Sequence, residues 1–599
     1  MARSVGRLLR RERPAEPAGD RAPACVVLVM HKEARATVRT LNRLADTRDP
    51  EQPVGILVVA NGSPPATIAE VNALWARLPE LELLTLPARL DSRGALARAL
   101  EQATAEVVVA LSPGVEPQPG WLPPLLRTLD DPAVLGTAPV LRALDGTLVS
   151  AGSAFPPGDA PQPFLAGFPP ADAAFLAEHP LSAVHGPAVA FRTADLAALG
   201  GPRPETGDAL GWADFSLLLA ATRSGHFRTS LQSSVVVRNP ASPSPQERAR
   251  FTAHWPEGPG DDVELWRRAG FAVTGHDADG TPELRRLPVA VRQGVPCLRW
   301  AVKNPATALS RGEQWGDTHF CRRLAEALRR LGQAVAIDHR EAFDRPTGQF
   351  DDVTLVVRGL SPHTPTPGAI NLAWLISHPE LLTANEAAAY DRVFAAGPAW
   401  AEQRSREWHL RIDPLLQATD AALFHPDRAA PDSGHPVLFV GSAREGGRDI
   451  VRQATEAGLT VTAYGTGWDG HLPASQIAGD YLDNDALGVA YRGAGIVLND
   501  HWAAMRTGGF VSNRLFDAAA AGARVITDDV TGLDALAGVF GRSVQVARGP
   551  EDIQRLAADL AAFGDDAERR AVAARVHAGH SFDARARVLL DAALELRAR

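Results

Sequence analysis

Residues 496–529 carry, in immediate succession, the pattern of a strand, a loop, a helix and a second strand. The apolar run 496–498 ends at Asn499, where a buried strand would reach its carboxyl end, and Asn499 is therefore a candidate donor-binding residue. Ser512 is a favourable helix N-cap, and the alanine-rich run 513–521 after it predicts a helix that ends at a glycine. Such a unit is typical of a doubly wound α/β domain, which binds ligands beyond the carboxyl ends of its strands.

The start of this predicted helix suits a phosphate group. The backbone amides of Ser512 and Asn513 would be free there, and the helix dipole adds positive charge. Asp517 lies one turn further along, on the same face as Asn513. We therefore expect a nucleotide diphosphate at the helix start and a ribose diol at Asp517. An ordinary amphipathic helix with a capped start is the alternative.

Composition restricts the class of protein. A chain of 599 residues is too long for one core and predicts two to four domains. The net charge of −9 argues against nucleic acid as the main partner. Cys25, Cys297 and Cys321 are too far apart in sequence for a metal or disulfide pattern, which suits the cytoplasm. Residues 1–23 are basic without an apolar core, which predicts a disordered tail rather than a signal peptide.

No apolar run approaches the roughly 20 residues of a transmembrane helix, so the sequence predicts a protein without a transmembrane segment. The basic tail leaves peripheral association with the inner face of a membrane open.

Strand and helix patterns alternate regularly from Cys25 onward, which predicts βαβ units and a parallel sheet. The order of the motifs VVLVMHKEARATVRTLNRL, ILVVANGS and GWADFSLLLAATRSGHF resembles family-two glycosyltransferases of the GT-A fold, over residues 24–240. The resemblance implies transfer of a sugar from a nucleotide diphosphate that is held by a divalent cation.

The chain departs from that family at its functional positions. Ala60 stands where the family has an aspartate, and Ser112-Pro113-Gly114 stands where it has the cation-binding Asp-x-Asp. Serine, proline and glycine supply no carboxylate for a cation. Of the Glu-Asp pair that supplies the catalytic base only Asp214 remains, so we expect this domain to be inactive and to position an acceptor glycan or mediate association. Asp214 would then be a helix-start residue.

Charge neutralisation by Arg192 or Arg238, without a metal, is the alternative.

Residues 241–295 are rich in proline and glycine and lack a stable periodicity, which predicts a linker. Trp255, Trp266 and Phe271 indicate that part of this segment packs against a domain.

Residues 296–430 predict a second doubly wound domain. Two candidate catalytic side chains follow its strands: Asp317, at a turn that opens a helix, and His378, after a long apolar run. His378 would face the ligand side and bind a sugar hydroxyl or transfer a proton. A histidine that is hydrogen-bonded within its own loop is the alternative.

Residues 431–599 predict a third such domain. After the strand 437–440 comes Gly441, and Arg444 and Arg448 are spaced to lie on one face of a helix and clamp a diphosphate. A solvated, basic helix end is the alternative for these arginines. The next strand ends at Tyr464, with Gly465 for close approach and Trp468 nearby; either aromatic ring would stack on a base or pack in the core.

The motifs RWAVKNP, WGDTHF, WLISHPE, LFVGS, LNDHW and GFVSNRLFDAAAAGA closely resemble group-one glycosyltransferases of the GT-B architecture, in particular the spore-maturation-protein-like branch, over residues 296–598. The resemblance implies two Rossmann-like domains, of which the first binds the acceptor and the second the nucleotide sugar. Of the two glutamates of that family, seven residues apart, the first is Gly509 here and the second is Asp517.

The sequence therefore predicts a hexosyl- or deoxyhexosyltransferase that moves a sugar from a nucleoside diphosphate to a glycan, lipid-linked glycan or polysaccharide, as in the synthesis of a cell-surface glycan. Arg444, Arg448, Arg514 and the helix start at Ser512 would stabilise the leaving diphosphate, so we expect neither a metal nor another cofactor. The alternatives are a non-catalytic scaffold that binds a sugar nucleotide, an enzyme with both halves active, and a nucleotide-sugar epimerase.

Overall fold

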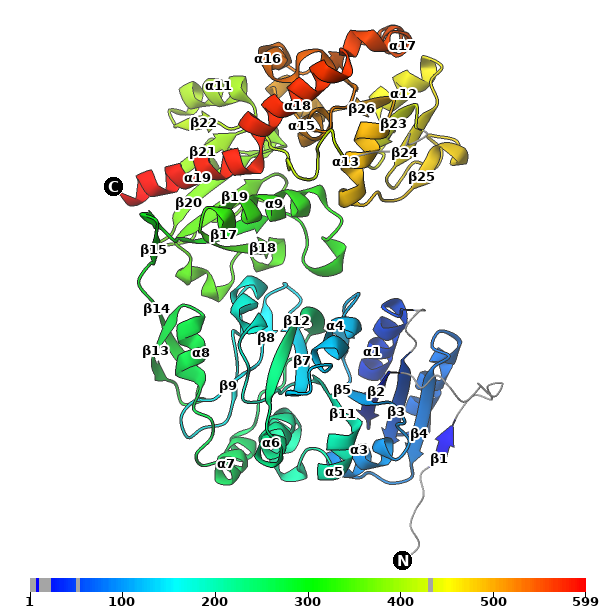
Figure 1. Ribbon diagram of the computed structural model, residues 1–599, viewed down its shortest axis with the longest axis vertical. Coiled ribbons are helices and arrows are strands. Elements are labelled where there is room, and N and C mark those ends of the chain that lie inside the picture. Colours follow the sequence, from blue (N-terminus) through cyan, green and yellow to red (C-terminus); the bar gives the residue numbers. More distant parts are fainter. Residues whose placement is uncertain (1–6, 10–22, 50–53, 429–434) are drawn as a thin grey trace, which may run out of the picture. The chain divides into compact units, whose positions relative to one another are not determined.

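A computed structural model describes residues 7–9, 23–49, 54–428 and 435–599 (Figure 1). The chain divides into two compact units: the first ends at Pro288 and also includes Ala308–Ser310 and Arg345–Thr347, and the second is the rest of the chain from Val289 onward. Most of the predicted tail lies outside the described residues, and Arg7–Leu9 within it forms strand β1, which pairs with β4 (Leu81–Leu86). Among the described residues, no helix is long and apolar enough to cross a membrane.

The first part of unit 1 is the predicted parallel sheet. Its strands pair in the order β4, β3, β2, β5. The strands and the helices between them are β2 (Ala24–Met30), α1 (Ala34–Asp46), β3 (Gly55–Asn61), α2 (Pro65–Asn72), α3 (Ser92–Leu100) and β5 (Val107–Leu111). These strands are buried on both faces, which is why they appear in the sequence as unbroken apolar runs.

The sheet then continues with mixed strand directions, which the sequence does not reveal. Strand β11 pairs antiparallel with β5 and β7, and the long strand β12 runs parallel to β7. The elements are β6 (Val115–Pro117), α4 (Leu122–Thr128), β7 (Val134–Arg142), β8 (Leu148–Ser150), β11 (Ala188–Arg192), α5 (Thr193–Leu199), α6 (Gly207–Thr222) and β12 (His226–Val237).

The segment 241–295 differs from the expected linker, because it is largely folded and its residues through Pro288 belong to unit 1. It forms α7 (Pro245–His254), α8 (Asp262–Arg268) and the hairpin of β13 (Phe271–His276) and β14 (Pro282–Arg286). A capping box between Ser244 and Glu247 starts α7, with the proline at a position where helices accept it. Phe251 and Trp266 are buried, so tertiary packing outweighs the local composition.

Unit 2 opens with a fully parallel sheet in the order β18, β17, β19, β20, β21, β22. Its elements are β17 (Arg299–Asn304), α9 (Gly316–Arg330), β18 (Ala334–His339), β19 (Val353–Arg358), β20 (Ile370–Leu375), α10 (Ala384–Ala388), β21 (Arg392–Ala395), α11 (Pro398–Trp408) and β22 (Ile412–Pro414). The carboxyl-terminal helix α19 (Phe582–Arg597) packs on α9, where Phe582 contacts Phe320. The last helix thus belongs to the core of this sheet (Figure 1).

The second sheet of unit 2 is also parallel, in the order β25, β24, β23, β26, β27, β28. Its strands are β23 (Val437–Val440), β24 (Val461–Tyr464), β25 (Ile477–Gly479), β26 (Ile496–Asn499), β27 (Val525–Thr527) and β28 (Val544–Val546). Its helices are α12 (Asp449–Glu456), α13 (Asn484–Gly493), α14 (Ala503–Gly508), α15 (Asn513–Ala520), α16 (Ala537–Phe540), α17 (Pro550–Ala558) and α18 (Asp566–His580). The strand order reverses between β23 and β26, the place where doubly wound sheets bind ligands.

Two loops approach closely beside that switch point. Gly465 follows β24 with a φ of +135°, and a Cβ there would lie 2.5 Å from the carbonyl carbon of Gly441. The Gly441 amide also donates to the Tyr464 carbonyl, at 2.8 Å. Glycine at position 465 is therefore required for the loops after β23 and β24 to meet.

We expect Gly465→Ala to destabilise unit 2 by about 3 kcal/mol or more, since both the backbone conformation and the overlap with Gly441 are unfavourable. Gly458→Ala is the matched control: its φ is also positive, at +80°, but nothing lies within 4 Å of the added Cβ. That change should cost about 1 kcal/mol. Scanning calorimetry compares the two, and equal losses would show that the loops do not meet.

Candidate active site

Two adjoining cavities lie at the carboxyl edge of the second sheet of unit 2. Cavity A, of about 400 Å³, is lined among others by Gly441, Tyr464, Gly465, Tyr481, Asn513 and Asp517. Cavity B, of about 460 Å³, is lined among others by Asp317, Arg444, Arg448, Asp500, Trp502 and Ser512. Both cavities are also lined by Gly316, Phe320, Asn513 and Arg514, so they lie next to each other.

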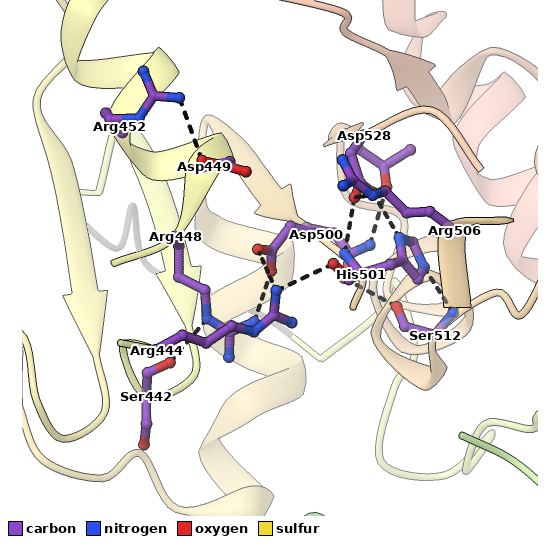
Figure 2. Close-up of polar contacts among 12 residues, drawn as sticks. Ser442, Arg444, Arg448, Asp449, Arg452, Asp500, His501, Arg506, Ser512 and Asp528 are labelled. Carbon is purple, nitrogen blue, oxygen red and sulfur yellow. Dashed lines mark hydrogen bonds and ion pairs between the residues drawn. The ribbon is translucent and has the colours of Figure 1, made fainter. Parts of the chain in front are cut away.

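Arg444 and Arg448 converge in cavity B, although not as the sequence predicts. Residues 441–448 form a loop, and Arg448 is only the N-cap of α12, so the two side chains do not share a helix face. They meet at Asp500 instead (Figure 2). Arg444 Nη1 donates to Asp500 Oδ2 at 3.2 Å, and Arg448 Nη1 donates to Asp500 Oδ1 at 2.9 Å.

The cluster has more positive than negative charge. Arg514 reaches the same cavity, so three guanidinium groups face the carboxylates of Asp500 and Asp317. Burial lowers the pKa of Arg444 and lowers the pKa of Arg448 to about 10, and repulsion from Arg514 acts in the same direction. The buried Nε of Arg444 has no hydrogen-bond partner among the described residues. An anion in cavity B would relieve both conditions.

The hydrogen bonds at the start of α15 differ from those that the sequence predicts. Ser512 does not cap the helix with its side chain: its hydroxyl donates to Asn499 Oδ1, at 3.0 Å. Its amide, expected to be free for phosphate, donates to His501 Nε2 at 2.9 Å. Because Nε2 accepts, the proton of His501 is on Nδ1, which lies 2.6 Å from Asp528 Oδ1. This chain of contacts fixes the helix start (Figure 2).

Asn499 is fully buried and is a supporting residue rather than the expected donor-binding one. Its Oδ1 accepts from Ser512 and from Arg514 Nη1, at 3.2 Å, and its amide donates to Thr527 Oγ1. It lies at the end of β26, as predicted, but its side chain is fully engaged with its neighbours.

Asp517 is also more buried than its place near a helix start suggests. Its two oxygens accept from Thr419 Oγ1 at 2.7 Å and from Asn513 Nδ2 at 2.6 Å. Burial raises its pKa well above the ordinary value. The Oδ1 of Asn513 is buried and has no partner in the described part of the chain. Asn513 lines cavity A, and its hydrogen bond to Asp517 orients its side chain there.

Gly441, Tyr464 and Gly465 line cavity A, at the positions where the strand ends predict a nucleotide. Trp468 is a core residue: it is buried against Phe439, and its Nε1 donates to the Gly441 carbonyl at 3.0 Å. The exposed ring of the cavity belongs instead to Tyr481.

Of the two candidate catalytic residues, Asp317 lines cavity B and His378 lies beside it. Burial raises the pKa of Asp317, and the proximity of His378 partly opposes that rise. The ring of His378 is 5.6 Å from that of Trp502, and its Nδ1 lies 3.1 Å from Glu380 Oε1. A hydrogen bond within its own loop was the alternative for this histidine, and that contact is present.

Sequence reasoning missed Asp500, His501, Trp502 and Asp528 as site residues. A signal for them exists, since the first three directly follow β26 and Asp528 directly follows β27. Polar residues at the carboxyl ends of adjacent parallel strands meet at one sheet edge.

In unit 1, Asp214 is a structural residue. It lies inside α6 rather than at its start and is fully buried, and it accepts from Arg203 Nε at 2.8 Å and from Trp255 Nε1 at 2.9 Å. Arg192 donates to backbone carbonyls and Arg238 pairs with Glu116, so both alternative cations are engaged.

A cavity of about 430 Å³ lies at the carboxyl ends of β2, β3 and β5 in unit 1, and Ser112 and Pro113 line it. The carboxylates in its lining accept from backbone amides: Glu33 from His31 and Lys32, and Asp91 from Gly94. The residues present therefore do not fit the paired cation ligands of a family-two enzyme.

Two parts of the chain match known families. Residues 25–152 match the family described as glycosyl transferase family 2, and residues 444–591 match the family described as glycosyl transferase-like. Over 124 residues the chain is 32% identical to polypeptide N-acetylgalactosaminyltransferase 15 of Mus musculus, which covers 20% of this chain and 19% of that protein. The chain thus spans about a fifth of the length of that curated relative.

Three solved structures share weaker similarity. The structure of GalNAc-T7 with UDP, GalNAc and Mn²⁺ is 17% identical in sequence to this chain. The match covers 41% of this chain and 50% of that chain, with a TM-score of 0.32. Sucrose-phosphate synthase from Thermosynechococcus elongatus is 14% identical, with coverages of 50% and 99% and a TM-score of 0.38. A mannosyltransferase from Pyrobaculum calidifontis in complex with GDP-Man and Mn²⁺ is 17% identical, with coverages of 43% and 76% and a TM-score of 0.29.

The two family matches fall on the two units separately, in the order that the sequence motifs predict. The expected α/β fold class is confirmed. Residues 25–152 match glycosyl transferase family 2 and residues 444–591 match the glycosyl transferase-like family, and together the two matches agree with a tandem of a GT-A and a GT-B glycosyltransferase unit.

Proposed function

We propose that the GT-B unit transfers a sugar from a nucleoside diphosphate to a glycan or polysaccharide acceptor. The observation that carries this proposal is the convergence of Arg444, Arg448 and Arg514 on cavity B, where an anion would offset their charge. The diphosphate would bind these arginines, and the nucleoside would extend into cavity A, between Tyr481 and Asn513.

The proposed reaction breaks the bond between the sugar's anomeric carbon and the diphosphate, which leaves with the bonding electrons. The developing negative charge on the leaving oxygen is stabilised by the guanidinium groups, which are already in place and partly shielded from water. An acceptor hydroxyl forms the new bond to the anomeric carbon. Asp317 is the candidate for taking its proton, since burial raises the pKa of this carboxyl and so strengthens it as a base.

The proposal also covers the donor sugar, the acceptor and the role of the GT-A unit. The donor sugar would be a hexose or deoxyhexose, and the acceptor a glycan, free or lipid-linked, on a cell-surface biosynthetic route in the cytoplasm. The GT-A unit would position the acceptor glycan or mediate association, because the positions of its cation ligands and of its base do not support transfer.

Arg444→Ala should weaken nucleoside diphosphate binding by about 10- to 100-fold, since it removes a charge-assisted contact from a half-buried site. Thermal-shift titrations with UDP, GDP, ADP, TDP and CDP identify the nucleotide first and then compare the variants. Arg452→Ala is the matched control: this arginine is on α12, exposed, and paired with Asp449 and Glu456. Equal affinity in wild type and Arg444→Ala would refute the placement of the diphosphate.

We expect donor hydrolysis or transfer to survive complete chelation by EDTA, because arginines rather than a cation would stabilise the diphosphate. Asp214→Asn should leave the rate within about two-fold, since this residue is tied to Arg203 and Trp255 in the other unit. Rates measured with EDTA, and again after manganese is added back, check this. Activity that disappears and returns with manganese would place the reaction in the GT-A unit.

His378→Ala should leave nucleotide affinity unchanged and reduce the transfer rate, because the residue lies beside cavity B, in the domain expected to bind the acceptor. Nucleotide titration and initial rates of transfer separate the two effects. An unchanged rate would leave His378 with its loop contact to Glu380 as its role.

A further inference from the structure

A third cavity continues from cavity B along the same sheet edge. This cavity C, of about 360 Å³, lies beyond the carboxyl ends of β26, β27 and β28. It is lined among others by Ile450, Gln453, Arg506, Asp528, Asp529 and Arg548. Cavities B and C are both lined by Arg444, Asp500, His501 and Trp502, so a ligand in B can extend into C.

Trp502 forms the boundary between these two cavities. Although it is a large apolar residue, 45% of its surface is exposed. The Arg444 guanidinium lies over its ring, 3.9 Å from the centroid, and the His378 ring is nearby. Its indole N–H has no hydrogen-bond partner among the described residues. One face of the indole ring is therefore covered by the guanidinium, and its exposed remaining surface is a suitable platform for the C–H groups of a sugar ring.

The charges in cavity C select against a second phosphate. Its lining holds three arginines against four aspartates, whereas cavity B has three arginines against two. Arg548 pairs with Asp529, and Arg506 lies 3.8 Å from Asp528. Figure 2 shows Arg506, Asp528 and His501 grouped on one side of Asp500, with Arg444 and Arg448 on the other. A balanced set of this kind suits a neutral ligand with many hydroxyl groups, because carboxylates accept and guanidinium groups donate.

Gln453 adds a free polar group to the cavity. It lies on α12, is half-buried, and its side-chain amide makes no hydrogen bond to another described residue. An amide both donates and accepts, which again matches a sugar hydroxyl. The apolar part of the wall is supplied by Ile450 and Ala547.

We propose that cavity C, although it lies in the domain expected to bind the donor, is a subsite into which the acceptor glycan extends from cavity B, where residues of both domains meet, and that it binds a neutral sugar unit next to the one that reacts in cavity B. Trp502 stacks on the glycan where it passes from B to C, and Gln453 and the Asp529–Arg548 pair bind its hydroxyl groups. This inference rests on the proposed function, which places the leaving diphosphate, and with it the bond that breaks, in cavity B. The acceptor class is thereby a neutral oligosaccharide of at least two units rather than a monosaccharide or a phosphorylated sugar.

The test measures oligosaccharide binding without any nucleotide. Wild-type protein is titrated calorimetrically with linear mono- to tetrasaccharides of glucose, mannose, galactose and N-acetylglucosamine, and separately with inorganic phosphate. We expect at least one oligosaccharide to bind with a Kd of about 1 mM or tighter, and its monosaccharide to bind at least about 10-fold more weakly. No binding by any of these oligosaccharides would overturn the proposal.

Gln453→Tyr, which fills the cavity, should weaken oligosaccharide binding by at least about 10-fold. Gln453→Ala, the milder change, should weaken it by about 3-fold. Trp502→Ala should weaken oligosaccharide binding by a similar factor, and Trp502→Phe should weaken it less. Glu456→Gln, on the exposed face of the same helix, is the matched control and should change nothing. Equal affinity in Gln453→Tyr and wild type, or phosphate binding that Gln453→Tyr weakens, would also overturn the subsite.

Nucleoside diphosphate titrations of the same variants keep the two proposals apart. They also show that Gln453→Tyr is folded. Oligosaccharide binding that depends on Gln453 in a protein that binds no nucleotide would refute the donor site alone. Nucleotide binding that depends on Arg444, without oligosaccharide binding, would refute the subsite alone.

Discussion

The Asp500 carboxylate holds two guanidinium groups at once, one on each oxygen. Because one anion faces two half-buried cations, and Arg514 adds a third, positive charge remains uncompensated where water is partly excluded. Such a cluster is stable only because Asp500 orients the arginines and Phe439 and Trp502 provide aromatic faces beneath them. The attraction for an anion is therefore built into the folded domain before any ligand binds.

The location of this site was predictable from sequence, whereas its contacts were not. Buried parallel strands appear as apolar runs in a sequence, so the carboxyl ends of β23, β24 and β26 could be located from their residues. These ends form the edge of the sheet at which ligands bind. Side-chain partners, however, come from distant parts of the chain: Arg444 and Asp500 are 56 residues apart, and Thr419 and Asp517 are 98 apart. No local pattern contains that information, which is why Arg448 was wrongly assigned to a helix face.

Local composition conceals two features of the fold. The prolines and glycines of residues 241–295 indicate a linker, but Pro245 stands at the first turn of a helix, where its missing amide is not needed. The polar stretch before Val235 likewise hides the long strand β12, whose register with β7 depends on pairing far along the chain. In both places packing around buried aromatic residues such as Trp266 decides the structure, and propensity is overridden.

The folded segment and the altered chemistry of unit 1 are connected through one residue. Trp255, which follows α7, donates its indole N–H to Asp214, and Arg203 donates to the same carboxylate. Both oxygens of this buried carboxylate therefore already accept hydrogen bonds, and neither is open to a substrate hydroxyl. It would regain the role of a base only by releasing both partners, and a guanidinium and an indole would then be left unpaired near the core. The contact that anchors α7 therefore opposes catalysis at this position, independently of the missing carboxylates at Ser112.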